Sequence, residues 1–526
     1  MKNLNKNKNL IFFITLFFII IMNYFNFIGF KEIKDDPIDY LKYTLNFAVN
    51  NTQSLSSHQG EEFYFDDDRS IGYSYINSLF LKSNREQIKT KSLDCFLKGE
   101  DQFCKKIIIK LQKINFFYYF IICISIILIT HKLTEKISIS FLSGILFSIN
   151  TFFLSSISFL NPEIVSTFLV LWLGYFSYTF FKTSNKFSIF FLIITSAALY
   201  FFKPVFIFYF LFLILTSIIF NFRKEKKRNN YMKILKLFII FSISICPLYT
   251  YKFFNTKNFN NSEKITEVSD TIKKIKDNYY KKYSKNKSKN FMKDYNFNDQ
   301  LLPDNTGGEA LLSRAVHGMI DWKEIPALIV SYIPKINLYL LDKFFDEKKI
   351  ERVKPGATFE GRNRNYFLIY RKYISEDYLM ENGYNIKEIN TLKKSIIIYL
   401  SNPIKQIVLT PIFAFRGIMG ATNISDIIIR FNKSNFNLII YSIFAITTFI
   451  LQIVSLSLLI FIFLKNFFIK KKNTFIYFIA APAYSIIFHS AFTHYIGRYS
   501  EPLIAIAFVF LMIFLYQLIQ KKKIYE

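Results

Sequence analysis

Carboxylates gather directly after the first long apolar run, in the stretch KEIKDDPIDYLKY at 31–43. Asp35, Asp36 and Asp39 lie within a few residues of the end of that run. A carboxylate at a membrane face is partly desolvated, which raises its pKa and suits it to take a proton from a hydroxyl group. The same stretch also describes a helix start, in which Asp36 caps the helix and Pro37 takes the first position. The two interpretations are compatible, because a capping carboxylate can still accept a proton.

A second acidic stretch follows in the same polar segment, EEFYFDDDRSIGYSYINSLFL at 61–81. Asp66–Asp68 stand directly before Arg69, with Tyr73 a few residues further on. Adjacent carboxylates can bind a divalent cation, but on a loop they are usually only hydrated. We therefore predict an ordinary polar loop that leads into an amphipathic helix, with no metal site and no cofactor.

Isolated charged residues stand at other breaks between apolar runs. Glu163, in the turn NPE, is either a helix-start residue or an active-site acid. Lys203, before a proline, either reaches toward lipid headgroups or binds a lipid phosphate. The last break reads HYIGRYSEP and holds His494, Arg498 and Tyr499. A histidine and an arginine four residues apart can bind one phosphate by charge-assisted hydrogen bonds, and here we favour that interpretation.

Long apolar runs must position these side chains. About 20 apolar residues cross the hydrocarbon core of a bilayer as a helix. The chain has 526 residues, of which 52% are hydrophobic. The runs lie near 10–30, 107–130, 137–157, 163–181, 187–202, 204–221, 234–252, 436–464, 474–490 and 503–519. The sequence therefore predicts an all-α membrane protein with about ten transmembrane helices.

Basic residues set the expected orientation. The net charge of +29 would suggest a nucleic-acid partner in a soluble protein, but much of the lysine lies between apolar runs, so we expect no nucleic acid. The densest basic block, RKEKKR at 223–228, and the other basic connections fall on the side of the N-terminus. With the first run as a signal anchor, both termini are expected in the cytoplasm, and the bilayer is expected to be a bacterial plasma membrane.

The remaining segments divide the chain into three parts. Residues 1–252 form an N-terminal transmembrane module whose first extracytoplasmic loop covers 31–106, and 436–526 form a C-terminal transmembrane module. Between them, 253–435 is predicted to be a large extracytoplasmic loop domain. Its semi-apolar stretches 325–341 and 395–415 have the pattern of interfacial helices, or of a re-entrant element or extra spans.

Two cysteines lie in the first of these loops, as CFLKGEDQFC. Cys95 and Cys104 can form a small disulfide if the loop faces an oxidising compartment. The sequence leaves this pairing open. Cys123 and Cys246 fall inside apolar runs, where a cysteine usually acts as a small hydrophobic residue.

The acidic first loop and the last break together resemble the membrane glycosyltransferases of the GT-C fold, such as the dolichyl-phosphate-mannose protein mannosyltransferases and the bacterial aminoarabinose transferases. The matching positions are Asp36 with Tyr40 and Ala48, Arg69 with Gly72 and Tyr73, Glu163 between spans three and four, and Arg498, Tyr499 and Pro502 before the last span. Ser74 stands where the family often has proline. The resemblance covers the topology of nearly the whole chain, while 253–435 matches only in position.

The resemblance implies an inverting transfer of a sugar from a polyprenyl-phosphate donor to a glycolipid, polysaccharide or protein acceptor. Asp36 would be the general base and Glu163 a second acid of the site. A cationic and aromatic set would hold the lipid phosphate and the donor: Arg498, Lys203, His494, Arg69, Tyr73 and Tyr499.

Two other classes of protein share parts of this pattern. O-antigen polymerases and ligases also combine many spans with one large far-side loop, but their first loop is usually short, whereas 31–106 is long and acidic. Transporters and flippases usually place charges within spans near the midplane, whereas the charges here cluster at the far face. The sequence therefore favours a glycosyltransferase over both.

Overall fold

The structure of the chain is a computed structural model. It describes 2–33, 37–55, 57–60, 70–158, 160–221, 227–260, 391–420, 435–469, 474–493 and 497–525, with single positions between 311 and 325. The described residues form helices and their connections, and no strand occurs among them. The prediction of an all-α protein is therefore confirmed at this level.

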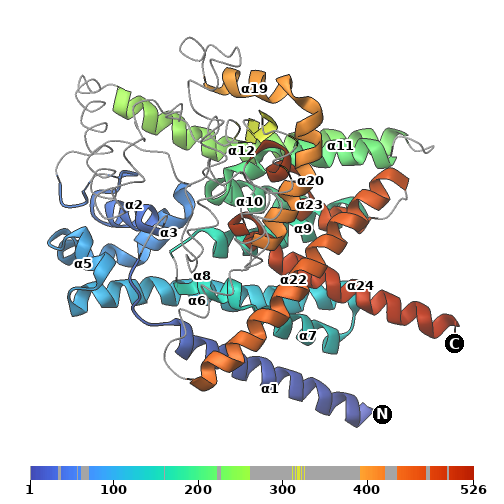
Figure 1. Cartoon of the computed structure of the whole chain (residues 1–526), viewed down its shortest axis with the longest axis horizontal. Helices are drawn as coiled ribbons and strands as arrows, with labels where there is room; N and C mark the ends of the chain where they lie inside the picture. Colours follow the sequence, from blue (N-terminus) through green and yellow to red (C-terminus); the bar gives the residue numbers. More distant parts are fainter. Residues whose placement is uncertain are drawn as a thin grey trace.

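Long apolar helices form the body of the molecule (Figure 1). Six of the described helices are long and apolar enough to cross a membrane. They are α1 (Lys2–Phe27), α6 (Gln102–Thr134), α9 (Glu163–Thr183), α12 (Lys227–Asn260), α22 (Asn435–Ile469) and α24 (Ile504–Tyr525). Their runs of Ile, Leu and Phe contain few polar side chains, and a helix satisfies its backbone hydrogen bonds within one segment.

The other predicted spans form shorter apolar helices. These are α7 (Ile137–Ser148), α10 (Lys186–Phe202), α11 (Tyr209–Asn221) and α23 (Ile476–Phe492). The run 137–157 is divided, because α8 (Thr151–Ser158) follows α7 after a break. A multispanning membrane protein is thus supported by six helices of full length, and the count of about ten spans stays a prediction.

Short helices of the first loop gather at one end of the bundle. They are α2 (Pro37–Asn50), α3 (Ile71–Leu81), η1 (Lys82–Asn84), α4 (Arg85–Lys89) and α5 (Leu93–Lys98). Pro37 takes the first position of α2, as predicted, because its fixed φ suits a helix start. Both chain ends lie on the side of the molecule opposite to α2, α3 and α5 (Figure 1).

Apart from positions between 311 and 325, the described part of 253–435 after α12 is a bent pair of helices, α19 (Thr391–Ser401) and α20 (Pro403–Gly420), whose axes differ by 99°. Pro403 disfavours helical backbone at the residue before it, so α19 ends there and α20 begins. The predicted stretch 395–415 is therefore helical with a sharp bend. Most of 325–341 lies outside the described residues.

Neutral polar side chains join α1 to α6, α7 and α22 inside the bundle. Asn23 donates to the Tyr119 hydroxyl over 3.0 Å and to the Ser148 carbonyl over 2.9 Å. The Tyr441 hydroxyl donates to Asn23 Oδ1 over 2.9 Å, and Asn26 donates to the Tyr441 hydroxyl over 3.2 Å. We call Asn23, Asn26, Tyr119 and Tyr441 the neutral seam. In hydrocarbon such hydrogen bonds fix helices relative to one another, since water does not compete for them.

Candidate functional site

The structure brings Glu163 and Lys203 together as an ion pair. Glu163 is the first residue of α9, where a carboxylate is favoured by the helix dipole. Lys203 stands between α10 and the short helix η2 (Pro204–Phe208), where Pro204 ends the preceding helix. Lys203 Nζ lies 2.8 Å from Glu163 Oε1. The Glu163 side chain is fully buried, and that of Lys203 is 15% exposed.

Aromatic rings cover this ion pair. Lys203 Nζ lies 5.4 Å from the ring centroid of Tyr499, which belongs to the short helix η6 (Gly497–Leu503). The His489 imidazole, in the last turn of α23, stacks on Tyr499 with centroids 4.6 Å apart. His489 Nδ1 lies 3.0 Å from Thr493 Oγ1. Tyr499 thus contacts both a cation and an imidazole, which is suited to holding charged groups in place.

A second buried acid, Glu501, lies in η6, which contacts α9. Glu501 Oε2 accepts a 2.8 Å hydrogen bond from Ser156 Oγ in α8. The Thr167 hydroxyl lies 2.8 Å from the Glu163 carbonyl and 3.4 Å from the Glu501 carbonyl, so η6 contacts the first turn of α9. We call Glu163, Lys203, His489, Tyr499 and Glu501 the charged cluster.

The ion pair changes the expected roles of two residues. The sequence predicts that Lys203 reaches lipid headgroups or binds a phosphate, and that Glu163 is either a helix-start residue or an active-site acid. In the structure each is first a partner of the other, because a buried carboxylate is costly unless a cation neutralises it. An ammonium group has three donors, of which one is directed at Glu163. Glu163 therefore holds the Lys203 ammonium group at a fixed point.

Tyr73 lies in the packing between loop and bundle. Its hydroxyl donates to Asn115 Oδ1 of α6 over 2.9 Å, and its ring meets that of Tyr40 edge to face. Burial raises the pKa of Tyr73, and the Glu163 carboxylate adds to the rise. Gly72 directly precedes Tyr73. A Cβ on Gly72 would lie 2.9 Å from the ring of Phe202, the residue before Lys203 in the sequence. This contact positions α3 against the charged cluster.

Several predicted site residues lie outside the described residues. These are Asp36, Arg69 and His494, and Asp66–Asp68 of the predicted polar loop lie outside as well. Arg498 belongs to η6, but its side chain also lies outside. Before residues 34–36 the Ile33 amide donates to the Leu97 carbonyl over 3.1 Å, and after them Pro37 begins a buried helix. The site assignments of Asp36, Arg69, His494 and Arg498 stay predictions.

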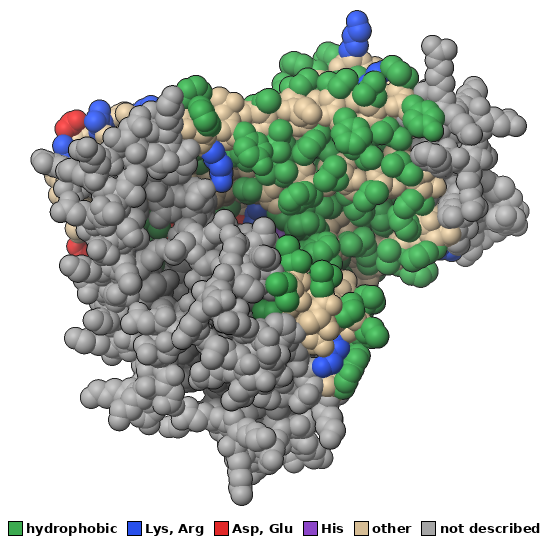
Figure 2. Space-filling model, turned by 90° about the horizontal axis from the view of Figure 1, so that it is seen from above, with side chains coloured by type: hydrophobic (Ala, Val, Ile, Leu, Met, Phe, Trp, Pro, Cys, Tyr) green, Lys and Arg blue, Asp and Glu red, His purple; other side chains and the backbone are tan. Residues whose placement is uncertain are grey.

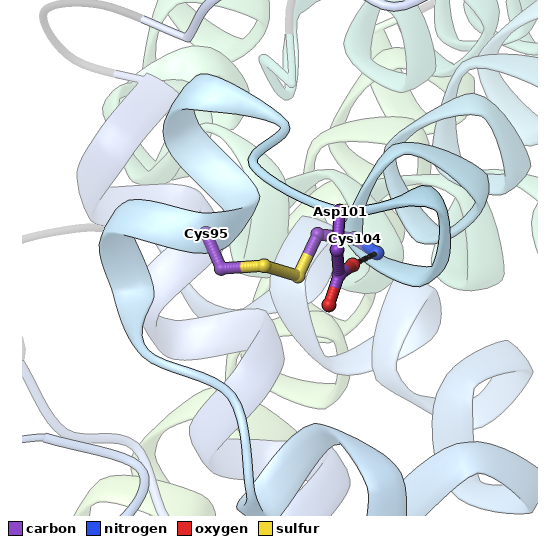
Figure 3. Close-up of side chains that lie close together, drawn as sticks. All are labelled: Cys95, Asp101 and Cys104. Atoms are coloured by element: carbon purple, nitrogen blue, oxygen red, sulfur yellow. Dashed lines mark hydrogen bonds between the residues drawn. A yellow bond between two sulfur atoms is a disulfide. The ribbon is translucent and has the colours of Figure 1, made fainter.

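A disulfide joins Cys95 to Cys104, the pairing that the sequence left open (Figure 3). It connects α5 to the start of α6, and Gly99 between them has a φ of +64° and packs on the Phe30 ring. Asp101 Oδ1 accepts a 2.7 Å hydrogen bond from the Cys104 amide, and Asp101 Oδ2 lies 2.6 Å from Lys91 Nζ. Cys95, Asp101 and Cys104 have the composition of a metal site, but both sulfurs are already bonded, so they offer no thiolates.

Two members of the charged cluster were not among the predicted site residues. His489 lies where the predicted span 474–490 meets the last far-side loop, and a histidine at the end of an apolar run is itself a signal. Glu501 belongs to the same RYSEP motif as Tyr499, and its acidity was the available signal.

No family model, no curated protein and no solved structure matches the chain. The site is therefore interpreted from its own residues and from the resemblance in motifs given above.

Proposed function

We propose that the chain is a GT-C-type glycosyltransferase, which moves a sugar from a polyprenyl-phosphate donor to an acceptor at the extracytoplasmic face of a bacterial plasma membrane. The observation that carries the proposal is the convergence of Glu163, Lys203 and Tyr499. They come from three separate connections between helices. Glu163 and Tyr499 stand at positions that match the family's motifs, and Lys203 is a candidate cation for the lipid phosphate. A glycolipid, polysaccharide or protein acceptor would meet the donor there.

In the proposed reaction Asp36 accepts the proton of the acceptor hydroxyl as that oxygen attacks the anomeric carbon. The bond between the anomeric carbon and the phosphate oxygen breaks, and the lipid phosphate leaves with the bonding electrons. Attack opposite the leaving group inverts the anomeric configuration. Negative charge grows on the phosphate during this step, so fixed cations near it lower the barrier.

The charged cluster would supply part of that stabilisation. Lys203 is held beside Glu163 and over the Tyr499 ring, so its ammonium is already oriented before the donor binds. Arg498 precedes Tyr499 in η6 and would add a guanidinium that binds phosphate oxygens in pairs. His494 would complete the set from the same connection.

The distribution of charge supports a site at one face over a transport pathway. Among the described spans, charged side chains stand near helix ends, as Glu163 does in α9 and Lys465 does in α22. Transporters usually carry such groups near the midplane. The disulfide in the first loop also supports an oxidising compartment for this end of the molecule, with both termini in the cytoplasm.

The proposal is tested by replacing Asp36 with asparagine and analysing the surface glycans of the host by mass spectrometry. Asparagine keeps the helix cap but does not accept a proton at neutral pH. We expect a glycan to lose the mass of one sugar at matched expression. Asp39→Asn, which removes a carboxylate in the first turn of α2, is the matched control and should leave the glycans unchanged.

The outcomes separate the assignment of the base from the function itself. If deletion of the chain alters a glycan but Asp36→Asn does not, the base is another residue, with Glu163 and Asp66–Asp68 next to be tested. If deletion changes no glycan, the glycosyltransferase proposal is wrong.

A further inference from the structure

The outer face of α20 is apolar, and its polar side chains Gln406 and Arg416 lie on the buried face. That face also carries Leu409 and Phe413, and Thr410 is half-buried. Its outer face carries Ile404 and Ile407, which are 70% and 72% exposed. Leu400, at the end of α19, continues this apolar face and is 65% exposed.

This polarity is the reverse of that of a helix at a water-facing surface. A surface helix in water turns its apolar stripe to the core and its polar side chains outward. Each Å² of apolar surface left in water costs about 25 cal/mol, and soluble monomers rarely expose contiguous apolar patches. A helix with polar groups inside and apolar groups outside has the pattern of a lipid-exposed helix.

The inner face is occupied by the protein itself. Arg314 is fully buried and donates from Nη2 to the Gln406 carbonyl over 2.8 Å and from Nε to the Ser490 carbonyl over 2.9 Å. Gln406 Nε2 donates to the Ala315 carbonyl over 2.8 Å. These bonds fix which side of α20 faces the bundle, and the apolar side faces away from it.

The start and the end of α20 are both fixed at the same end of the transmembrane helices. Near its start, Gln406 is linked through Arg314 to Ser490 in the last turn of α23. Near its end, the Gly417 carbonyl accepts a 2.9 Å hydrogen bond from Ser500 in η6, which follows α23. A helix fixed in this way does not reach the opposite membrane face.

Interfacial side chains stand beside the apolar face. Lys405 Nζ lies 5.8 Å from the ring centroid of Trp322, whose side chain is exposed. Trp and Lys are the residues that usually mark the boundary between headgroups and hydrocarbon. On the neighbouring α22, Ile443, Ile446 and Ile450 are exposed in the same way. Figure 2 shows a broad hydrophobic surface with few charged side chains on it.

We infer that α19 and α20 form a re-entrant elbow, whose outer face inserts among the lipid acyl chains of the far leaflet. Its partner is therefore the hydrocarbon of the bilayer, not a soluble protein or the aqueous phase. Through the hydrogen bond from Ser500 to the Gly417 carbonyl, the elbow contacts η6, the short helix that carries Tyr499 and Glu501. This inference needs only a membrane and does not depend on the proposed reaction.

Spin-label accessibility tests the inference in the full-length chain. A nitroxide is attached to Ile407→Cys in a Cys246→Ser background, which retains the disulfide and the buried Cys123. The protein is reconstituted in vesicles of phosphatidylethanolamine and phosphatidylglycerol. Collision with oxygen, which concentrates in lipid, is compared with collision with a water-soluble nickel chelate. Ile404→Cys is a second position in case the first variant does not fold.

Two reference labels calibrate the measurement. Ile443→Cys on α22 reports a lipid-facing site, and Lys98→Cys on α5, whose side chain is 56% exposed, reports a water-facing site. We expect the ratio of oxygen to nickel collision at Ile407 to match that at Ile443. A ratio like that at Lys98 would show a water-facing surface and overturn the inference. Low collision with both reagents would show that protein covers this face, and would overturn it as well.

Discussion

The neutral seam and the charged cluster each join polar side chains from several helices inside an apolar bundle, but they do so with different groups. In the neutral seam, the uncharged Tyr441 hydroxyl donates a hydrogen bond to the uncharged amide of Asn23. In the charged cluster, Glu163 and Lys203 bring two ions out of water. Neutral hydrogen bonds are sufficient to fix helices, whereas a buried ion pair often stabilises no more than an apolar pair would. We therefore propose a chemical role for the charged groups of the cluster and a structural role for the amide groups of the seam.

The largest expected effect comes from breaking the ion pair. Glu163→Gln leaves the Lys203 ammonium beside a neutral amide, and an uncompensated buried charge costs about 3 kcal/mol of stability. We expect a large drop in the thermal unfolding temperature in detergent, with loss of transfer. Glu163→Gln combined with Lys203→Gln removes both charges and should recover most of the stability. If the single variant unfolds at the temperature of the wild type, the pair is not a buried one.

A smaller effect is expected from the neutral seam. Asn23→Leu keeps a similar volume but removes the bonds to Tyr119 and Tyr441, which costs about 2 kcal/mol. Stability should fall, but activity per folded molecule should stay that of the wild type. Thermal unfolding and glycan analysis on the same preparation test both parts. Loss of activity at unchanged stability would erase the distinction between the two regions.

Gly72→Ala tests the packing between the loop and the charged cluster. Its Cβ would lie 2.9 Å from the Phe202 ring and 3.0 Å from the Phe201 carbonyl, so α3 must shift away from the end of α10. Overpacking of this kind costs about 1 kcal/mol. Because Lys203 follows Phe202 directly, we expect activity to fall by more than the loss of folded protein explains. Ser70→Ala, just before α3, is the control and should change neither quantity.

The smallest effect concerns Asp101. The Cys104 amide, and then Lys91, hold the pKa of its carboxyl below the ordinary value of 3.8. The folded state therefore favours the charged form, and this contribution is present above pH about 4 and is lost as the pH falls through the lowered pKa. Asp101→Asn should lower the unfolding temperature slightly at pH 7 and by less at pH 3. Asp94→Asn, in the exposed pair with Lys98, should have no effect at either pH. An equal effect of Asp101→Asn at both pH values would contradict this account.

The helices could be predicted from the sequence because their signal is local. Each apolar run satisfies its own backbone within one segment, so the runs near 107–130 and 163–181 indicate α6 and α9 directly. The helix start at Pro37 was also a local signal. Span length was less predictable, since the break after Ser148 divides an otherwise continuous run.

The site was predicted only in part, because it depends on how helices pack. Glu163, Lys203 and Tyr499 were identified from their positions at breaks between runs. Their pairing was not predicted, since no local pattern relates residue 163 to residue 203. Arg314 illustrates the same limit, because its buried hydrogen bonds go to Gln406 and Ser490 on distant helices. A single arginine forms no sequence motif from which these partners could be predicted.

We propose that the charged cluster performs chemistry and is not required for the fold. The double variant Glu163→Gln with Lys203→Gln tests this role when it is expressed in a host from which the chain has been deleted. The mass of the host's surface glycans is measured at matched amounts of folded protein. We predict that this variant folds and leaves the glycans as they are in the deletion host. Restoration of the wild-type glycans by the uncharged pair would contradict it.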